Sequence, residues 1–142
     1  ASLIEVEITE GQWLHSHPTA LPQLRAMAAA GVRVAIDDFG SGYRNFGYLA
    51  GVPISHIKID PSLVTGLAES RTARLKVDAI IRLAAQLGYR TVAEGVEHEA
   101  ELELLRAWGC DEAQGFHLAR PMRAEAVTQL VLACRAGPLA DA

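Results

Sequence analysis

Cysteine and aromatic residues are scarce in this sequence. It also has no large excess of positive or negative charge and no long apolar run. The two cysteines, Cys110 and Cys134, are too few for a disulfide framework and are not spaced as a pair of metal ligands. No apolar run approaches the roughly 20 residues that a membrane-spanning helix needs. The net charge of −4 gives no reason to expect binding to DNA or RNA polymers. We therefore expect reduced thiols in a cytoplasmic domain, with no membrane segment in this chain.

What the chain does contain is enough apolar material for one core. It has 142 residues, of which 50% are hydrophobic, and this is the length of a single domain. We expect residues 1–136 to form that domain and residues 137–142 to form a flexible tail. Short apolar runs predict strands over 3–8, 32–36, 55–60, 91–94 and 112–118. Helical spacing predicts helices over 43–50, 72–87, 99–108 and 124–134, and another that Pro22 opens and Gly31 closes.

Strands that alternate with helices predict parallel strands joined by right-handed crossovers. An open doubly wound sheet and a TIM-like (β/α) barrel both fit this α/β alternation. The distribution of polar residues favours the barrel, because each expected strand carries one near its carboxyl end, where barrel enzymes build their active sites. These residues are Glu7, Asp37, Lys58, Glu94 and Gln114. The chain is thus predicted to supply about five β-α units of a partial barrel.

Two adjacent carboxylates, Asp37 and Asp38, follow the second expected strand. Side chains alternate direction along a strand, so both can aim at one point only if the strand ends before them. Adjacent carboxylates repel each other, and a cation is therefore their natural partner. Oxygen-only ligands favour Mg²⁺ or Mn²⁺ over zinc. The alternative is a strand-to-loop turn in which both Asp side chains are solvated.

Five short motifs occur in a characteristic order along the chain. They are Glu7-Ile8-Thr9-Glu10, Asp37-Asp38-Phe39-Gly40-Ser41-Gly42-Tyr43, Lys58-Ile59-Asp60, Ala93-Glu94-Gly95-Val96-Glu97 and Gln114-Gly115-Phe116. In order and spacing they resemble the motifs of EAL domains, the bacterial phosphodiesterases that linearise the second messenger cyclic di-GMP. The resemblance implies a hydrolase that produces linear pGpG and uses a two-metal site of Mg²⁺ or Mn²⁺.

The resemblance also implies a role for each matching residue. Glu7 and Asp37 are similar to ligands of the first metal, and Asp37 would also bridge to the second. Asp38 and Glu94 are similar to ligands of the second metal. A phosphodiester anion repels hydroxide, and two divalent cations remove that obstacle by neutralising the anion and acidifying a bridging water.

Four further residues have implied roles, three of them around the attacking water. Lys58 is similar to the residue that contacts, and in one interpretation deprotonates, this water. Glu97 resembles a carboxylate that positions it, and Gln114 resembles a residue that holds the water network. Nearby metals would lower the pKa of Lys58, whereas carboxylates would raise it, and the sequence does not decide between them. Glu10 resembles the anchor of the loop after Asp38.

Two departures from the family pattern set further expectations. The Glu-Ala-Leu signature and a metal-binding asparagine, which belong to an earlier part of the barrel, are absent, so the chain resembles the C-terminal portion of the domain. By itself it would lack two ligands of the first metal, and a half-barrel would have exposed sheet edges. Arg44 and Asn45 replace small hydroxyl residues in the loop, and we hypothesise an ion pair between Glu10 and Arg44.

The family resemblance extends to partners, and it leaves one alternative function open. A homodimer is expected, and the parent protein can carry a fused sensor or diguanylate cyclase (GGDEF) domain and be attached to a membrane. The alternative is a degenerate, non-catalytic module that binds cyclic di-GMP or docks on another protein. Survival of all the carboxylates named above favours the enzyme.

Histidines are common metal ligands, but the spacing of the histidines in this chain does not favour a metal site. His15 and His17 have no third ligand at useful spacing and are expected to be solvated. His56 is expected at the surface, where its strand starts. His117 differs in parity from Gln114 and would face the other side of a straight strand, which leaves it a weak candidate.

Overall fold

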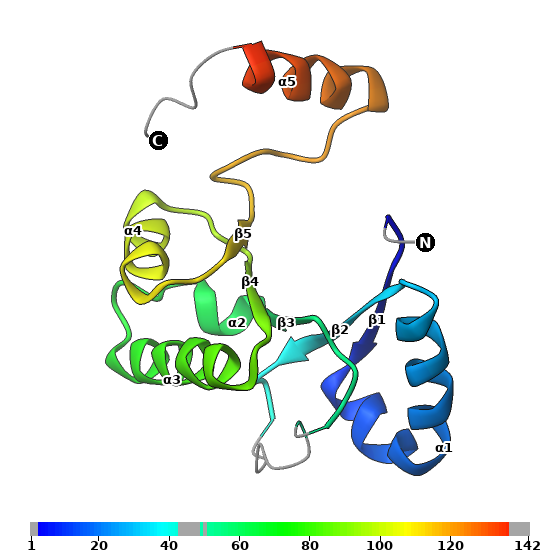
Figure 1. Ribbon diagram of the computed structural model, residues 1–142. Helices are drawn as coiled ribbons and strands as arrows, with labels where there is room; N and C mark the ends of the chain where they lie inside the picture. Colours follow the sequence, from blue (N-terminus) through cyan, green and yellow to red (C-terminus); the bar gives the residue numbers. More distant parts are fainter. Residues whose placement is uncertain (1–2, 43–48, 50, 137–142) are drawn as a thin grey trace.

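The computed structural model describes residues 3–42, 49 and 51–136, with side chains left undescribed at 13–18 and 134–136, and it contains one sheet with helices (Figure 1). The five strands of this described part are β1 (Glu5–Thr9), β2 (Arg33–Phe39), β3 (His56–Ile59), β4 (Arg90–Glu94) and β5 (Glu112–Gln114). Each strand pairs in parallel with the next, in the order β1-β2-β3-β4-β5. Strand order that follows chain order is typical of a barrel, whereas a doubly wound sheet reverses its order. The predicted partial α/β barrel is confirmed.

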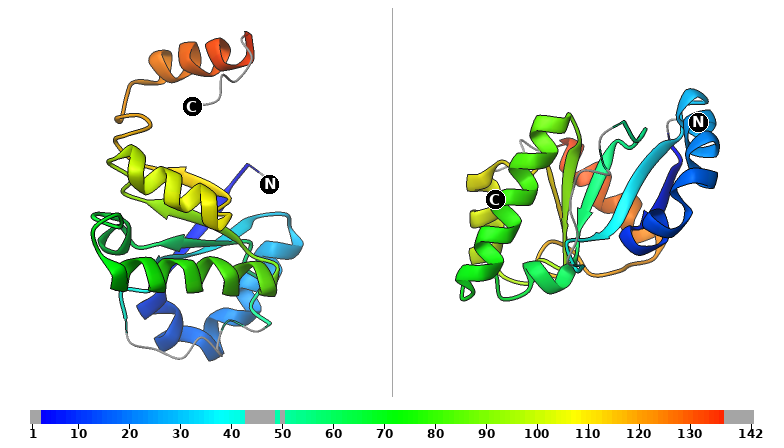
Figure 2. Two further views of the ribbon diagram at one scale, coloured as in Figure 1. Left: turned by 90° about the vertical axis from the view of Figure 1, so that its left-hand side faces the viewer. Right: turned by 90° about the horizontal axis from the view of Figure 1, so that it is seen from below.

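The helices are α1 (Glu10–Ala29), α2 (Pro61–Val64), α3 (Arg71–Leu87), α4 (Glu99–Trp108) and α5 (Ala124–Ala136). One face of the sheet packs against α1, α3 and α4 (Figure 2). Helix α5 follows β5 through residues 115–123 and stands away from the sheet in both figures. None of the helices in the described part has the length and apolar character that crossing a membrane requires.

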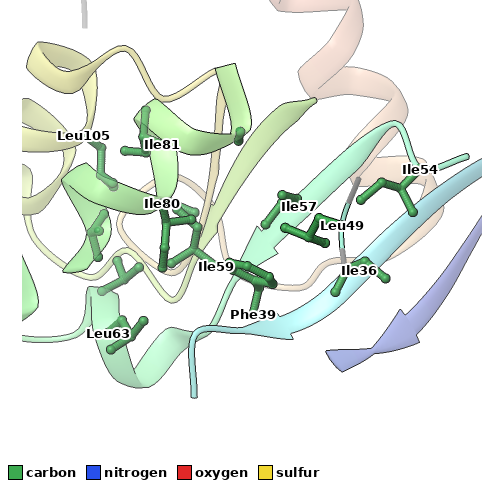
Figure 3. Packing of buried hydrophobic residues seen from close by; sticks show 14 of the residues in the cluster. Ile36, Phe39, Leu49, Ile54, Ile57, Ile59, Leu63, Ile80, Ile81 and Leu105 are labelled. Carbon is green, nitrogen blue, oxygen red and sulfur yellow. The ribbon is translucent and has the colours of Figure 1, made fainter. Parts of the chain in front are cut away.

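The core lies between the sheet and the helices that cover it. Ile57 and Ile59 of β3 are fully buried; Ile59 lies beside Ile80 of α3 and Phe39, and Ile57 lies beside Leu49 (Figure 3). Because strand side chains alternate, Lys58, which lies between these isoleucines, points to the opposite, inner face of the sheet. The apolar positions of the strands thus hold the helices, and the intervening polar positions are left to form a site.

Two expected helices differ from the structure. Pro22 does not open the first helix, because Thr9 caps α1 thirteen positions earlier, accepting a hydrogen bond from the Gln12 amide at 3.3 Å. Helix α1 changes direction along its length in Figure 1, as prolines inside a helix cause. In α3 the helix bounds agree with the prediction, but the buried stripe is Val77, Ile80, Ile81 and Ala84. Leu75, one of the apolar residues whose helical spacing predicts this helix, is 64% exposed.

The prediction that His56 lies at the surface is wrong, because this residue is only 5% exposed. Its Nδ1 lies 2.8 Å from the Ser55 hydroxyl and 3.2 Å from a Glu5 carboxylate oxygen. The start of β3 is therefore a buried position, with Glu5 of β1 and Glu112 of β5 beside the imidazole. The expected helix over 43–50 and the expected tail over 137–142 lie outside the described residues, apart from Leu49, which is fully buried.

Candidate metal-binding rim

The carboxyl ends of the strands bring three carboxylates of the predicted site to one ammonium. Lys58 of β3 lies with its Nζ atom 2.6 Å from Glu7 Oε1 and 2.8 Å from Glu94 Oε1. The distance from the same atom to Asp37 Oδ1 is 3.7 Å. Glu7, Asp37 and Glu94 come from β1, β2 and β4, so residues far apart in the sequence converge. We call Lys58, Glu7, Asp37 and Glu94 the rim cluster.

The rim cluster is partly withdrawn from water. The side chain of Lys58 is 11% exposed, and that of Glu94 is 14% exposed. Burial favours the neutral amine, but hydrogen bonds from Lys58 to Glu7 and Glu94, with the charges of Glu94 and Asp37, raise the pKa of Lys58 above its ordinary value. The sequence left this direction open. Among the protein groups alone, the carboxylates outweigh burial.

Strand β2 continues through Asp37 and Asp38 instead of ending before them, so this part of the prediction is wrong. The physical reason is a bulge: Ile36 pairs with Ile57 and Phe39 with Ile59, which leaves one extra residue on β2. Asp38 takes up the irregularity with φ 54°, a left-handed conformation that Asp tolerates better than most residues. Asp37 can then face Lys58 while Phe39 stays in the core.

Asp38 is exposed next to the rim cluster and is tied into the bulge by its backbone. Its amide donates to Asp37 Oδ1 at 3.0 Å, and its carbonyl accepts from the Ser41 hydroxyl at 2.9 Å. Partial burial and the negative charges of Asp37 and Asp60 raise the pKa of Asp38. A carboxylate held against its neighbours in this way gains from a bound cation.

Glu10 lies under the segment that follows Asp38. It is 5% exposed, and its Oε2 atom accepts a hydrogen bond from the Gly40 amide at 3.2 Å. The two residues are thus linked where the loop leaves β2. The hypothesised ion pair between Glu10 and Arg44 lies outside the described residues.

Glu97 and Gln114 lie beside the rim cluster, at the carboxyl ends of β4 and β5. Gln114 pairs with Glu94 in the sheet. Both residues line a hollow of about 570 Å³ together with Glu94 and the Phe116 ring. Arg120, also on the hollow, lies 4.7 Å from the centre of that ring. The Nε2 atom of His117 instead lies 2.7 Å from Glu99 Oε2, away from the predicted site.

One buried carboxylate near this hollow has no role predicted from the sequence. Glu101 is 1% exposed and accepts hydrogen bonds from three backbone amides. A signal for it existed, because Glu101 stands three residues after the N-cap, the position of a capping-box glutamate. The family resemblance implies roles for Glu94 and Glu97 but none for Glu101.

The chemistry of the rim donors suits a hard divalent cation. Glu7, Asp37, Asp38 and Glu94 offer only carboxylate oxygens, the ligands that Mg²⁺ and Mn²⁺ prefer. In the part of the chain that the structure describes, no three acidic, histidine or cysteine side chains already surround a common point as metal ligands. The ammonium of Lys58 lies among the carboxylates instead. The residues therefore fit the implied metals by donor type and by their convergence.

Comparison with known proteins gives a consistent result. The family model of the EAL domain matches residues 1–121. The chain is 44% identical over 124 residues to the cyclic di-GMP phosphodiesterase PA2567 of Pseudomonas aeruginosa, covering 87% of this chain and 21% of that protein. It is 42% identical over 120 residues to the bifunctional diguanylate cyclase/cyclic di-GMP phosphodiesterase MucR of the same species, covering 84% and 18%.

Solved structures agree with these relatives. The PaMucR phosphodiesterase in complex with c-di-GMP superposes with a TM-score of 0.84 at 40% identity, covering 89% of this chain and 51% of that chain. The manganese/cy-diGMP complex of Klebsiella pneumoniae BlrP1 has a TM-score of 0.78 at 34% identity, covering 84% and 31%.

The chain thus spans about a fifth of the curated relatives that it matches and about half of the MucR structure. It corresponds to a C-terminal part of the domain, as the absence of the Glu-Ala-Leu signature and the metal-binding asparagine predicts. By its sequence and by its fold, the chain belongs to the EAL domain family.

Proposed function

We propose that this chain forms the metal-binding rim of a cyclic di-GMP phosphodiesterase, in which Glu7, Asp37, Asp38 and Glu94 hold two Mg²⁺ or Mn²⁺ ions. The observation that carries the proposal is the convergence of three carboxylates from three strands on Lys58. Several carboxylates at one barrel rim repel each other, which raises the free energy of the folded protein, and bound divalent cations offset this repulsion. Relatives named as cyclic di-GMP phosphodiesterases support the choice of substrate.

The proposed reaction is hydrolysis of one phosphodiester bond. Water adds to phosphorus, one P–O ester bond breaks, and the departing ribose oxygen takes up a proton, so the cyclic dinucleotide opens to linear pGpG. When bound, two cations would neutralise the charge of the phosphodiester and lower the pKa of the attacking water.

The chain's own residues would position the attacking water. Lys58 would contact the water, and its protonation state decides whether it donates a hydrogen bond or takes the water's proton. Glu97 and Gln114 would orient the water from the hollow that they line with Glu94. Glu10, through the Gly40 amide, would anchor the loop that follows the metal-binding aspartates.

The proposal includes the setting of the domain. We place it in the cytoplasm, where a free thiol such as that of Cys110 stays reduced. A parent protein with a fused sensor or diguanylate cyclase domain is in keeping with the bifunctional name of MucR. Assembly as a homodimer belongs to the same proposal.

The test is turnover of cyclic di-GMP by the full-length protein in Mg²⁺ or Mn²⁺, with the product identified by chromatography. We expect pGpG from the wild type and from the control E103Q, whose side chain is exposed on α4. We expect loss of turnover in D37N and in K58A. Tight binding of cyclic di-GMP without turnover by the wild type would contradict the proposal and support the degenerate binding module.

A further inference from the structure

Glu101 is a buried charged group that the proposed mechanism does not use. It stands at the start of α4 with 1% of its surface exposed. Its Oε2 atom accepts from the amides of Glu97 at 2.8 Å and His98 at 3.1 Å. Its Oε1 atom accepts from the amide of Gly66 at 2.8 Å. All partners are backbone groups, so what the carboxylate fixes is the path of the chain.

The first segment that Glu101 fixes is the loop from Glu94 to His98, which carries Glu97. Two other elements already confine this loop. The Val96 amide donates to the Gln114 carbonyl at 3.1 Å, and the Val96 carbonyl accepts from the His117 amide at 3.0 Å. On another side, a Cβ atom added at Gly95 would lie 2.8 Å from Pro61 Cβ. Contacts with β5 and α2 thus hold residues 95 and 96, and Glu101 holds the next two.

The second segment is the turn after α2, which contains Gly66. Helix α2 begins at Pro61, three residues after Lys58. One carboxylate therefore joins the loop that follows β3 to the loop that follows β4. These two strands supply Lys58 and Glu94, whose side chains are 2.8 Å apart in the rim cluster.

The chemistry of this contact requires an ionised carboxylate. Three amide donors converge on two oxygens, and an ionised carboxylate accepts on both. Burial disfavours the charge, but the amides of Glu97, Gly66 and His98 outweigh it and lower the pKa of Glu101. A glutamine has one acceptor oxygen and would turn its NH₂ group towards an amide donor. The site is therefore built for glutamate in this chain.

We propose that Glu101 is a positioning residue of the hydrolytic site, which sets the backbone of Glu97 and ties it to the loop that follows Lys58. The inference rests on the proposed function, since Glu97 is there assigned to the attacking water. Glu101 itself would touch neither substrate nor metal. A displacement of Glu97 by about 1 Å is enough to reduce the rate of a positioned reaction strongly.

The test compares E101Q and E101L with the control E103Q in the full-length protein. Glu103 is on the same helix and is exposed, so its change alters charge without touching the loops. We expect kcat for cyclic di-GMP to fall about tenfold in E101Q and about 100-fold in E101L, with KM within about threefold of the wild type. Wild-type kcat in a folded E101L would overturn the proposal, and so would a rise in KM with kcat unchanged.

Amide hydrogen exchange supplies a readout that does not need turnover. In E101Q we expect faster exchange at Glu97, His98 and Gly66, with the strands unchanged and E103Q like the wild type. Uniform acceleration throughout the domain would reveal a general stabilising role and overturn the proposal. If the wild type fails to hydrolyse cyclic di-GMP while the local exchange pattern is found, the proposed function fails, but the role of Glu101 in fixing the two loops stands.

Discussion

The ammonium of Lys58 lies 2.6 Å from a carboxylate oxygen of Glu7, a residue 51 positions earlier in the chain. The same ammonium lies 2.8 Å from Glu94. A positive side chain at the centre of carboxylates offsets their repulsion while no other cation is bound. Lys58 therefore has two proposed tasks, one in stabilising the rim and one at the attacking water.

Replacing Lys58 with Met separates the electrostatic task from the chemical one. Without divalent cations, we expect K58M to lower the free energy of unfolding by about 1 kcal/mol, because partly buried carboxylates, above all that of Glu94, lose their partner. Addition of Mg²⁺ should then stabilise K58M more than the wild type, since the cation meets carboxylates with no competing ammonium. Urea unfolding with and without Mg²⁺ measures both effects.

The matched control is K76M, which removes the same charge from the exposed surface of α3. It should show the wild-type response to Mg²⁺. Equal Mg²⁺ stabilisation of K58M and K76M would contradict the account of the rim cluster.

The side chain of Asp38 is a proposed metal ligand, and its backbone has a left-handed conformation. Two variants separate the effects of these two features. D38N retains a side chain that tolerates φ 54°, whereas D38A does not. We expect both to weaken Mn²⁺ binding in calorimetric titrations. D38A should also be less stable than D38N by about 1 kcal/mol in thermal unfolding. Wild-type Mn²⁺ affinity in D38N would remove Asp38 from the set of ligands.

Gly115 allows β5 to approach the loop that carries Glu97. A Cβ atom added there would lie 2.1 Å from the Val96 carbonyl oxygen, and backbone cannot move aside as a side chain can. We expect G115A to lower the free energy of unfolding by about 3 kcal/mol. The control G11A meets nothing within 4 Å and should gain up to about 1 kcal/mol of helix stability. Denaturant titrations in which G115A matches G11A would refute this packing.

The partly buried hydroxyl of Tyr89 should make the free energy of unfolding depend on pH. Its hydroxyl donates to the Leu49 carbonyl at 2.8 Å, with the Val52 carbonyl at 3.2 Å, and burial raises its pKa. A raised pKa means that its contribution is fully present below the unfolded pKa of about 10 and is lost as pH rises through the folded value. Y89F should lose about 1 kcal/mol at pH 8. Its stability should then fall less than that of the wild type above pH 10, and parallel curves would contradict the assignment.

Sequence patterns predicted the regular elements well where local signals agreed. The bounds of α4 match because glutamates occupy its first turn and Gly109 ends it in the left-handed conformation. The pattern of strands also correctly predicted that Glu7, Lys58 and Glu94 lie near the carboxyl ends of three different strands. In these elements the periodicity of apolar residues was sufficient.

The errors arose where tertiary contacts decide the local structure. The bulge at Asp38 depends on the register between β2 and β3, which no local pattern encodes. The burial of His56 depends on Glu5, which comes from a strand two places away in the sheet. The contact between Glu101 and the Gly66 amide, 35 positions away in the chain, likewise has no local sequence signal.

The most direct test of the metal-binding rim is a crystal structure of the full-length protein in Mn²⁺, with the ions located by anomalous scattering. The account predicts Mn²⁺ coordinated by oxygens of Asp37, Asp38 and Glu94, with a second ion bound by Glu7 and Asp37. It predicts no Mn²⁺ peaks at these positions in D37N. Wild-type crystals with Mn²⁺ only elsewhere, and Lys58 still bridging Glu7 and Glu94, would contradict it.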